Sequence, residues 1–339
     1  MDRIVYRIQK PGALKALKLV KEQVPALAPR EVRIATKAIG LNFADVFSIY
    51  GLYSATPKGS FIPGLEFSGT IIEKGSEVKE RNIGERVMGV TRFGAYSTVI
   101  QVSEETVFPI PNDWTFEDGA SYPVQALTAY FALFVLGDLK ENATVLIHSA
   151  AGGVGLYANR LAKTKGAFTI GVVGDRSKLF ILEKEGFDGS ILRGQKFKQN
   201  LENQLKNRPL NLVLECLGGS FFQDSYDLLS PTGRIVTYGS AGFVPKGLST
   251  NWFSVALRYW MRPKLDPLAM ISENKSVMGF NLIWLWDKMD ELREEFRLLQ
   301  KKNLSPLRIM ENFSFENLPM ALLRFQSGKT IGKVIVSIQ

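Results

Sequence analysis

A glycine-rich stretch at residues 150–155 is the part of the sequence whose residue types and spacing most clearly indicate chemistry. It matches A-x-G-x-x-G, one residue away from the fingerprint of dinucleotide-binding turns. Its residues are Ala150, Ala151, Gly152, Gly153, Val154 and Gly155. Such a turn lets the backbone N–H groups of a helix N-terminus face a pyrophosphate, with Gly152 permitting close approach and Gly155 letting the helix pack on a strand. The alternative is a glycine-rich turn that binds no ligand.

The residues about twenty positions further on bear on the choice between NAD and NADP. A carboxylate at the end of the second strand would pair with the ribose 2′-OH and repel a 2′-phosphate, but the strand-end residue here is Val173. Arg176 and Lys178 follow and can neutralise a phosphate, which favours NADP. Asp175 argues the other way, and the two basic residues can equally be solvated residues in the first turn of a helix.

A strand, a turn and a helix are needed to position these residues, and the sequence predicts all three. Residues 143–149 (ATVLIHS) predict a buried strand, 154–165 a helix and 168–173 a second strand, which together form a βαβ unit. Strands and helices alternate up to about residue 280, so we expect a parallel sheet with helical crossovers. Further strands are expected at 210–215, 233–238 and 277–280.

The sequence on either side of this region has a different pattern. Residues 1–124 contain short runs separated by Gly and Pro, and they predict a mostly β structure with strands at 31–38, 67–74, 86–90 and 96–102. An apolar helix is expected over 125–136. After residue 287 we expect helices to about 302 and over 315–326, and a last strand at 333–338. The predicted fold class is therefore α/β, with a Rossmann-type doubly wound parallel sheet and a β-rich second domain.

Composition limits the functions that the chain can have. Its 339 residues are 45% hydrophobic and 22% charged, as expected for a folded protein of roughly two domains. The net charge of +9 is spread along the chain without a basic block, so we expect no nucleic-acid partner. One cysteine and one histidine are too few for a disulfide or for the usual zinc ligands. Residues 1–12 lack the apolar core of a signal peptide, and we expect a cytosolic location and no membrane span.

Together with five further motifs, the glycine-rich stretch resembles the zinc-free quinone oxidoreductase branch of the medium-chain dehydrogenase/reductase superfamily. The motifs are GLNFAD at 40–45, GLY at 51–53, PGLEFSG at 63–69, LTAY at 127–130, HSAAGGVG at 148–155 and IGKVI at 331–335. The resemblance spans nearly the whole chain. Residues 262–264 and the aromatic segment 279–286 look similar to the vesicle amine transport protein-like subgroup. Where zinc-bearing relatives place a Cys and a His ligand, this sequence has Asn42 and Leu65.

The resemblance implies a GroES-like β-rich catalytic domain and a Rossmann dinucleotide-binding domain. The first would comprise residues 1–124 and 284–339, and the second residues 125–283, with the active cleft between them. Thr128, expected at the head of the helix that links the domains, matches a residue placed near the nicotinamide or phosphates. Asn42 and Tyr53 match residues that face the nicotinamide and the substrate. We therefore predict Asn42, Tyr53 and Thr128 as the catalytic-site residues.

The resemblance also implies that NADPH is the cofactor and that no metal is used. The predicted cofactor contacts are Ala151, Gly152, Gly153, Val154, Gly155, Arg176, Lys178, Arg193, Gly218 and Lys333. The family usually has Ser or Thr where Gly174 stands and Tyr where Arg193 stands, whereas Lys178 matches the family pattern. Arg193 either adds a charge-assisted contact to the 2′-phosphate or points to solvent.

The predicted function is NADPH-dependent reduction of a quinone or an enone. No second histidine and no nucleophile paired with a base stand out, so the protein would hold a nicotinamide against a flat acceptor, with a proton from water. One alternative is an NADPH-binding peripheral membrane or vesicle-associated protein with little enzymatic activity. The other is an NADP-linked dehydrogenase of another small carbonyl. The resemblance further implies a homodimer that pairs edge strands of the dinucleotide domain.

Several other residues have more than one interpretation. The Trp-rich segments 251–261 and 280–286 would line an acceptor pocket, give weak membrane association, or pack in the core or a dimer. We interpret His148 as a neutral core histidine and Cys216 as a small core residue. Glu66 is expected to brace backbone or Arg groups near the cleft, and Asp45 to brace a helix or the cleft.

Overall fold

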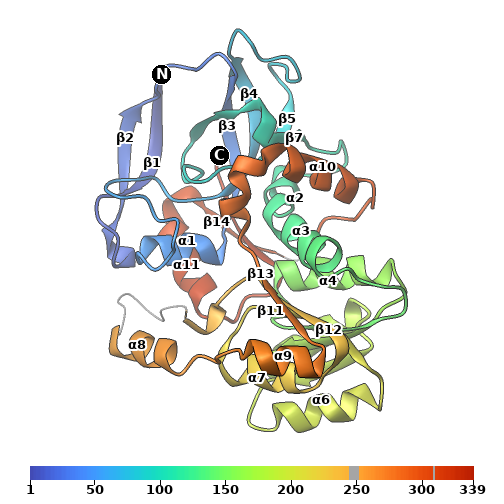
Figure 1. Ribbon diagram of the computed structural model, residues 1–339. Coiled ribbons are helices and arrows are strands. Elements are labelled where there is room, and N and C mark those ends of the chain that lie inside the picture. Colours follow the sequence, from blue (N-terminus) through green and yellow to red (C-terminus); the bar gives the residue numbers. More distant parts are fainter. Residues whose placement is uncertain (244–251, 308–309) are drawn as a thin grey trace.

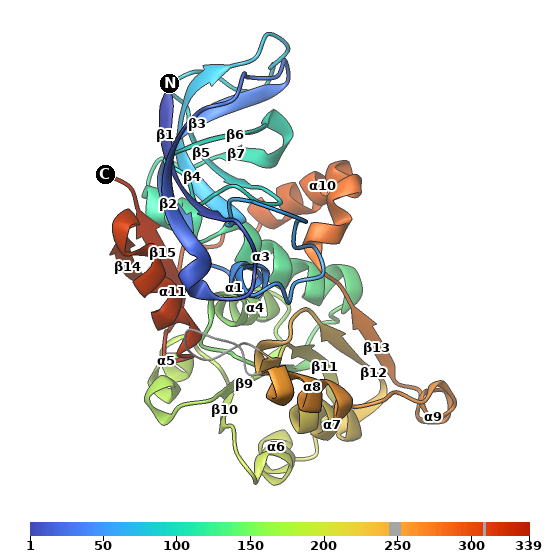
Figure 2. The ribbon, with the colours of Figure 1, turned by 90° about the vertical axis from the view of Figure 1, so that its left-hand side faces the viewer.

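The computed structural model describes residues 1–243, 252–307 and 310–339. Two large sheets organise the molecule, one above the other in Figure 1. The chain begins in a separate two-stranded pair, enters the upper sheet, forms the whole of the lower sheet with its middle part, and returns to the upper sheet at its end. Figure 2 shows α-helices between the two sheets.

The upper sheet has seven strands, which come from the first third of the chain and from its last thirty residues. Its order is β14-β15-β3-β4-β5-β7, and β6 also pairs with β3. The strands are β3 (Glu31–Gly40), β4 (Glu66–Lys74), β5 (Arg86–Val90), β6 (Val99–Ser103), β7 (Val107–Pro109), β14 (Met310–Ser314) and β15 (Lys333–Ser337). A separate antiparallel pair joins β1 (Asp2–Ile8) to β2 (Leu17–Gln23). Because β15 pairs antiparallel with β3, residues near Lys333 lie beside Gly40.

The lower sheet has six strands, and all of its pairs are parallel. The strands are β8 (Thr144–Ile147), β9 (Phe168–Val173), β10 (Gly189–Leu192), β11 (Leu210–Glu215), β12 (Leu229–Thr237) and β13 (Ser276–Gly279). Their order is β10-β9-β8-β11-β12-β13, which is 3-2-1-4-5-6 in sequence terms. This is the Rossmann order, and ligands of such sheets bind beyond the carboxyl end of the first strand. The predicted fold class is confirmed.

Eleven α-helices lie in the described residues. They are α1 (Phe43–Ile49), α2 (Phe116–Ala120), α3 (Pro123–Tyr130), α4 (Gly153–Lys163), α5 (Leu179–Lys184), α6 (Phe197–Leu205), α7 (Gly219–Asp227), α8 (Trp252–Trp260), α9 (Pro267–Glu273), α10 (Met289–Gln300) and α11 (Leu318–Gln326). In the described part of the chain, no helix is both long enough and apolar enough to cross a membrane.

An aromatic core joins the two sheets. Tyr122, which precedes α3, meets the ring of Tyr157 of α4 edge-on at 5.3 Å between centroids, and Phe296 of α10 at 5.9 Å. Phe108 of β7 contacts Phe296 from the upper sheet at 4.1 Å. Burial of such rings supplies much of the apolar contact area in a core. The aromatic core therefore holds α3 and α4 between the sheets.

The linking helix differs from its predicted position. It begins at Pro123, two residues earlier than expected, because proline is favoured in the first turn of a helix. Thr128 therefore lies in the second turn and not at the head of the helix. The helix continues as a π-helix over Phe131–Leu136, so its predicted end is confirmed. The domain boundaries after residues 124 and 283 stay a prediction.

Candidate active site

A buried ion pair lies where β15 meets β3 and β4. Lys333 Nζ lies 2.6 Å from Glu66 Oε2, and the side chains are 2% and 0% exposed. The second carboxylate oxygen of Glu66 accepts a hydrogen bond from the backbone N–H of Val124, at 2.8 Å. Burial lowers the pKa of Lys333, while the Glu66 carboxylate favours its charged form. Glu66 thus braces the backbone at the start of α3, as expected, and its charged partner is a lysine and not an arginine.

Asn42 joins this ion pair to α3. Its Oδ1 accepts hydrogen bonds from Lys333 Nζ at 2.9 Å and from Gln125 Nε2 at 2.5 Å. Its Nδ2 donates to Gly40 O at 3.1 Å and to Glu66 Oε2 at 3.3 Å. The amide therefore uses both its donors and its acceptor inside the protein. We call Asn42, Glu66 and Lys333 the charged cluster. Contact of Asn42 with a nicotinamide or substrate stays a prediction.

Asp45 holds the helix that follows Asn42. Its Oδ2 accepts hydrogen bonds from the backbone N–H of Asn42 at 2.8 Å and from Tyr96 Oη at 3.0 Å. The first of these closes a capping box at the start of α1. Burial raises the pKa of Asp45 to about 7. Asp45 is a helix brace, as the sequence predicts.

The glycine-rich turn follows β8 and leads directly into α4. Gly152 is the N-cap of this eleven-residue helix, whose first N–H groups have no partners within the helix itself. A Cβ on Gly155 would lie 2.6 Å from the backbone of Ala150, so the helix packs on the strand end as predicted. Gly332 donates its N–H to Ala151 O at 2.8 Å, which ties the turn to the residue before Lys333. The turn suits a pyrophosphate group.

Arg193 lies against the end of β9, on the side where the second ribose of a dinucleotide is expected. A Cβ on Gly174 would overlap Arg193 Nη2 and lie 3.0 Å from its Cζ. The guanidinium is also 5.6 Å from the ring of Phe221, and burial lowers the pKa of Arg193. The glycine that replaces the family's usual Ser or Thr thus makes room for the arginine that replaces its usual Tyr. Together they place a cation at the strand end.

Lys178 and Asp175 have structural partners beside this strand end. Lys178 Nζ donates to Gly328 O at 2.6 Å and Thr330 O at 2.7 Å, and burial lowers its pKa. Asp175 accepts hydrogen bonds from Ser177, with its backbone N–H at 2.9 Å, and caps the short turn that contains Arg176. Asp175 therefore acts as a cap, and Arg176 is exposed at the surface.

The remaining predicted cofactor contacts are distributed around the turn. Gly218 follows β11 with φ +75°, and its N–H donates to Glu215 Oε1 at 2.7 Å. It lies at the same carboxyl edge of the sheet as the glycine-rich turn. Lys333 directs its side chain into the charged cluster, whereas the backbone beside it contacts the turn. A cofactor contact of either residue stays a prediction.

Tyr53 and Thr128 are not brought into the charged cluster by their hydrogen bonds. Tyr53 Oη donates to Asn281 Oδ1 at 2.9 Å, and burial raises the pKa of Tyr53 to about 12. Next to it, Trp284 Nε1 donates to Ser54 Oγ at 3.0 Å. Thr128 Oγ1 donates to Val124 O within its own helix, at 2.6 Å. Tyr53 therefore joins the loop after α1 to the segment after β13.

His148 and Cys216 are buried, as the sequence predicts. His148 Nε2 lies 3.0 Å from Ser225 Oγ, and burial lowers the pKa of His148 to about 3, so the ring is neutral. Burial raises the pKa of Cys216 to about 11, which leaves it a thiol. Among the described residues, no group of three or more His, Cys, Asp or Glu side chains is arranged to hold a metal ion.

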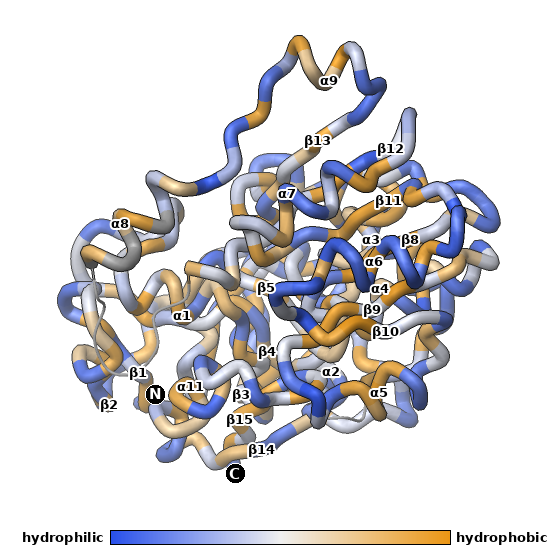
Figure 3. Tube along the Cα trace, turned by 90° about the horizontal axis from the view of Figure 1, so that it is seen from below, coloured by the Kyte–Doolittle hydropathy of each residue, from blue (hydrophilic) through white to orange (hydrophobic). Residues whose placement is uncertain are grey.

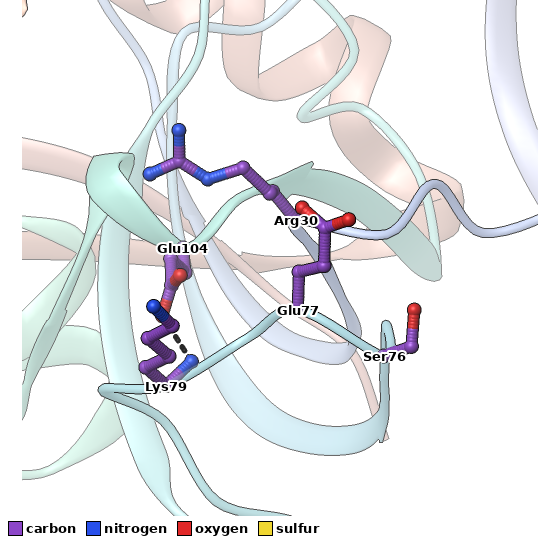
Figure 4. Close-up of a pocket in the computed structure, with 5 residues that line it drawn as sticks. All are labelled: Arg30, Ser76, Glu77, Lys79 and Glu104. Atoms are coloured by element: carbon purple, nitrogen blue, oxygen red, sulfur yellow. Dashed lines mark hydrogen bonds between the residues drawn. The ribbon is translucent and has the colours of Figure 1, made fainter.

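A surface cavity of about 550 Å³ lies away from this site, beside the loop between β4 and β5. Figure 4 shows Arg30, Ser76, Glu77, Lys79 and Glu104 around it. Glu104 Oε2 accepts the backbone N–H of Lys79 at 3.0 Å, so this carboxylate holds the loop. We assign no chemistry to this cavity.

A parallel sheet of Rossmann order, a β-rich partner and a glycine-rich turn at the switch point define a dinucleotide-type oxidoreductase of two parts. Family models agree: residues 28–112 match the alcohol dehydrogenase GroES-like domain, and residues 153–292 match the zinc-binding dehydrogenase family. The chain belongs to the medium-chain dehydrogenase/reductase superfamily, and it fits the zinc-free branch. The predicted family is confirmed.

Individual relatives point to the vesicle-protein subgroup. The synaptic vesicle membrane protein VAT-1 homolog of Danio rerio is 34% identical over 348 residues, covering 100% of this chain and 71% of the relative. The crystal structure of the human VAT-1 homolog-like protein aligns with a TM-score of 0.84 at 27% identity, covering 100% and 99% of the two chains. Escherichia coli quinone oxidoreductase complexed with NADPH aligns with a TM-score of 0.82 at 26% identity, covering 99% and 100%.

Two residues of the site were not expected from the sequence. Gln125 is separated from Asn42 by 83 positions, and Asn281 from Tyr53 by 228. A polar residue in the apolar run before LTAY was the signal for Gln125, since a buried amide needs hydrogen-bond partners. No feature of the sequence around Asn281 indicated that it would contact Tyr53.

Proposed function

We propose that the protein reduces a quinone or another conjugated carbonyl with NADPH. The observation that carries the proposal is the arrangement of Arg193 and Lys178 beside the end of β9, next to a dinucleotide-type turn at the N-terminus of α4. A 2′-phosphate is the group that distinguishes NADPH from NADH, and cations at this position recognise it. The NADPH complex of the structurally similar E. coli quinone oxidoreductase supports the same cofactor.

The protein's own residues would bind and orient the nucleotide. The N–H groups at the start of α4 face the pyrophosphate, Gly152 leaves room for it, and Arg193 and Lys178 bind the 2′-phosphate. When bound, NADPH supplies the hydride and leaves as NADP⁺. The acceptor gains that hydride and a proton from water. The charged cluster joins β15 and the residue before α1 to α3, which would keep the parts of the site that flank an acceptor in a fixed arrangement.

Aromatic side chains support a flat, conjugated acceptor. Phe280 follows β13, Tyr238 follows β12, and Phe131 lies at the end of α3. The ring of Phe280 is 5.0 Å from Phe131 and 6.5 Å from Tyr238, and all three are only partly buried. Such rings offer stacking surfaces for a quinone or enone.

The test is the loss of NADPH absorbance with a panel of quinones, enones and simple aldehydes. We expect turnover with at least one quinone or enone, slower turnover with NADH, and little with the aldehydes. Turnover of the aldehydes alone would favour a dehydrogenase of another small carbonyl. Tight NADPH binding without any turnover would contradict the proposed reaction.

A second candidate function is membrane attachment through the segment that contains α8 and α9. Figure 2 shows α9 projecting from the rest of the molecule, and Figure 3 shows the chain between α8 and α9 running outside the main body. The exposed side chains of this segment include Phe253, Trp260, Leu268 and Ile271, each at least 73% exposed. Residues 252–265 contain three basic residues, Arg258, Arg262 and Lys264, and no Asp or Glu, whereas Asp266 and Glu273 stand at the two ends of α9. Apolar and basic residues together favour an anionic lipid surface. Asn251, the first residue of the predicted aromatic segment, lies outside the described residues.

Co-sedimentation with vesicles tests this attachment. We expect binding to vesicles that contain phosphatidylserine and weaker binding to neutral ones, with a loss in Trp260→Ala and Leu268→Ser variants. Equal absence of binding to both kinds of vesicle would contradict it.

We further propose a homodimer that pairs β13 with the β13 of a second copy. In the described residues β13 is an edge strand, paired with β12 on one side. An open edge with unpaired backbone groups favours pairing with another chain. Light scattering after size-exclusion chromatography would show twice the chain mass, and a monomer at all concentrations would contradict the dimer. We also propose that the chain divides into its two domains after residues 124 and 283. The proposed location is the cytosol.

A further inference from the structure

Gln125 lies between the charged cluster and the glycine-rich turn. It is on α3, and only 9% of the residue is exposed. Its Nε2 donates to Asn42 Oδ1 at 2.5 Å, and the same oxygen accepts from Lys333 Nζ at 2.9 Å. Val124, the neighbouring residue, donates its backbone N–H to Glu66 at 2.8 Å. The first turn of α3 is thus attached to two of the three members of the cluster.

The other side of the Gln125 side chain packs against the start of α4. A Cβ on Gly153 would lie 2.6 Å from Gln125 Oε1 and 3.1 Å from both its Cδ and its Cγ. A real Cβ essentially never lies 2.6 Å from another heavy atom, so a side chain at position 153 would force Gln125 out of its present position. Figures 1 and 2 show α3 and α4 side by side between the sheets, where this contact is made.

The turn is joined to the cluster by a second route as well. Gly332 donates its N–H to Ala151 O, and Lys333, the next residue, reaches Asn42 and Glu66. One route is therefore the side chain of Gln125, and the other is a backbone attachment through β15. The two attachments meet at Asn42 Oδ1, which accepts from both. Two points of support fix the orientation of a segment better than one.

We propose that Gln125 is a positioning residue that fixes the glycine-rich turn relative to the charged cluster, and so sets the affinity for NADPH. The inference rests on the proposed function, because the ligand of the turn is taken to be the dinucleotide. Gln125 acts through Gly153 and Asn42. A displacement of the glycine-rich turn would therefore reach Asn42 through the side chain of Gln125.

A double-mutant cycle between Gly153→Ala and Gln125→Ala tests the proposal. In the wild-type background, Gly153→Ala pushes against Gln125, and we expect NADPH binding to weaken about tenfold or more. In the Gln125→Ala background the added methyl group has room, so the same change should weaken binding by less than about threefold. NADPH affinity is measured by titration calorimetry, and the free energy of unfolding of each variant by urea without nucleotide.

Two controls separate this contact from a general effect. Gly152→Ala changes the same turn, but its Cβ would meet only Ser149 O, at 3.2 Å. Its effect on NADPH affinity should be the same in the wild-type background and in the Gln125→Ala background. In Gln125→Met the bulk of the side chain is kept, so Gly153→Ala should again weaken binding about tenfold.

The outcomes distinguish this inference from the proposed function. Coupling between the two sites in the NADPH dissociation constant supports the inference. Coupling in the free energy of unfolding alone shows that Gln125 only packs the core, and it overturns the positioning role. Equal effects of Gly153→Ala in both backgrounds overturn it too. If the wild-type protein fails to bind NADPH, the proposed function itself is overturned. That outcome is seen with the wild-type protein alone and so differs from a failure of the inference.

Discussion

Lys333 and Glu66 form an ion pair that is almost completely removed from water. Each charge has the other as its counter-charge, and hydrogen bonds with Val124 and Asn42 supply the remaining polar contacts that water would otherwise give. The cost of removing one partner is therefore expected to exceed the contribution of the intact pair. The same residues hold Asn42 and the start of α3, so damage at the pair should reach the whole site.

The first prediction concerns this pair. Lys333→Met leaves the Glu66 carboxylate buried without a counter-charge, and we expect a loss of about 3–5 kcal/mol in the free energy of unfolding. Urea unfolding measures it. The double variant Lys333→Met with Glu66→Gln should lose less than Lys333→Met alone, since no buried charge remains. As a control, Lys288→Met removes an exposed pair with Glu291 and should cost less than about 1 kcal/mol. Equal losses for Lys333→Met and Lys288→Met would contradict the prediction.

The second prediction concerns the choice of nucleotide. Arg193→Leu removes the cation that packs on Gly174, and we expect NADPH affinity to fall about 10–100-fold, as for the loss of a charged hydrogen-bond partner. NADH affinity should change by less than about threefold, because NADH lacks the 2′-phosphate. Isothermal titration with both nucleotides measures this. Arg176→Leu, at an exposed residue, is the matched control and should have a smaller effect. A parallel loss for NADPH and NADH would contradict the assignment of Arg193.

The third prediction concerns the pH dependence of stability. Burial raises the pKa of Asp45 from 3.8 to about 7, so between these pH values the folded protein binds a proton that the unfolded chain does not. This contribution to stability is complete below pH 3.8 and is lost as pH rises through 7, with a slope of at most about 1.4 kcal/mol per pH unit. Asp45→Asn should remove the slope.

The measurement for Asp45 is the difference in free energy of unfolding between wild type and Asp45→Asn at several pH values. His148, whose pKa is lowered to about 3, gives the opposite slope below its ordinary value of 6.5. It is present in both proteins and cancels in the difference. The variant should gain stability relative to wild type as pH rises from 4 to 7. A difference that does not change with pH would refute the buried, protonated state of Asp45.

At this scale the sequence indicated single residues better than their partners. Burial of His148 and Cys216 and the bracing role of Asp45 follow from residue type and from the surrounding pattern. The identity of the charged partner of Glu66 could not be predicted from the sequence. That partner, Lys333, is 267 positions away and was expected at the cofactor. Contacts between distant residues are set by the pairing of β15 with β3, which no local pattern reveals.

At the scale of elements, the close approach of β3 to α2 gives a fourth prediction. A Cβ on Gly40 would overlap the carbonyl oxygen of Ala120 and lie 2.8 Å from Lys333 Cε. Gly40→Ala should therefore force the strand and helix apart and cost about 1–3 kcal/mol or more in the free energy of unfolding. Gly194→Ala is the matched control, since a Cβ there meets nothing within 4 Å, and it should be tolerated. Equal stability of the two variants would disprove the close approach.

The sequence predicted the bounds of several strands that are rich in apolar residues. The strands at 86–90, 168–173 and 210–215 have the predicted bounds. β7 and β10, with three and four residues, were missed because so short a run shows no alternation. The strand expected at 96–102 starts at Val99, since Ser97 forms an isolated bridge with Val5 instead. β1 and β2 were missed because charged residues interrupt both.

At the scale of the whole molecule, the two sheets are joined by an aromatic core and by polar contacts at the carboxyl edge of the lower sheet. The turn, the charged cluster and Arg193 belong to different elements, and all are placed around that edge. The family and fold class could be predicted from motifs, because the glycines and the LTAY and IGKVI segments are local. The relative position of the elements could not, since it depends on α3 and on the return of β15.

The central claim is that this edge binds NADPH. Thermal unfolding monitored by intrinsic fluorescence, with increasing NADPH or NADH, tests it most directly. A ligand that binds only the folded protein stabilises it by about 2.7 kcal/mol at a hundredfold excess over its dissociation constant. We predict a melting temperature that rises steadily with the logarithm of the NADPH concentration above its dissociation constant, and a smaller rise with NADH at the same concentration. An unchanged melting temperature at saturating amounts of both nucleotides would contradict the account.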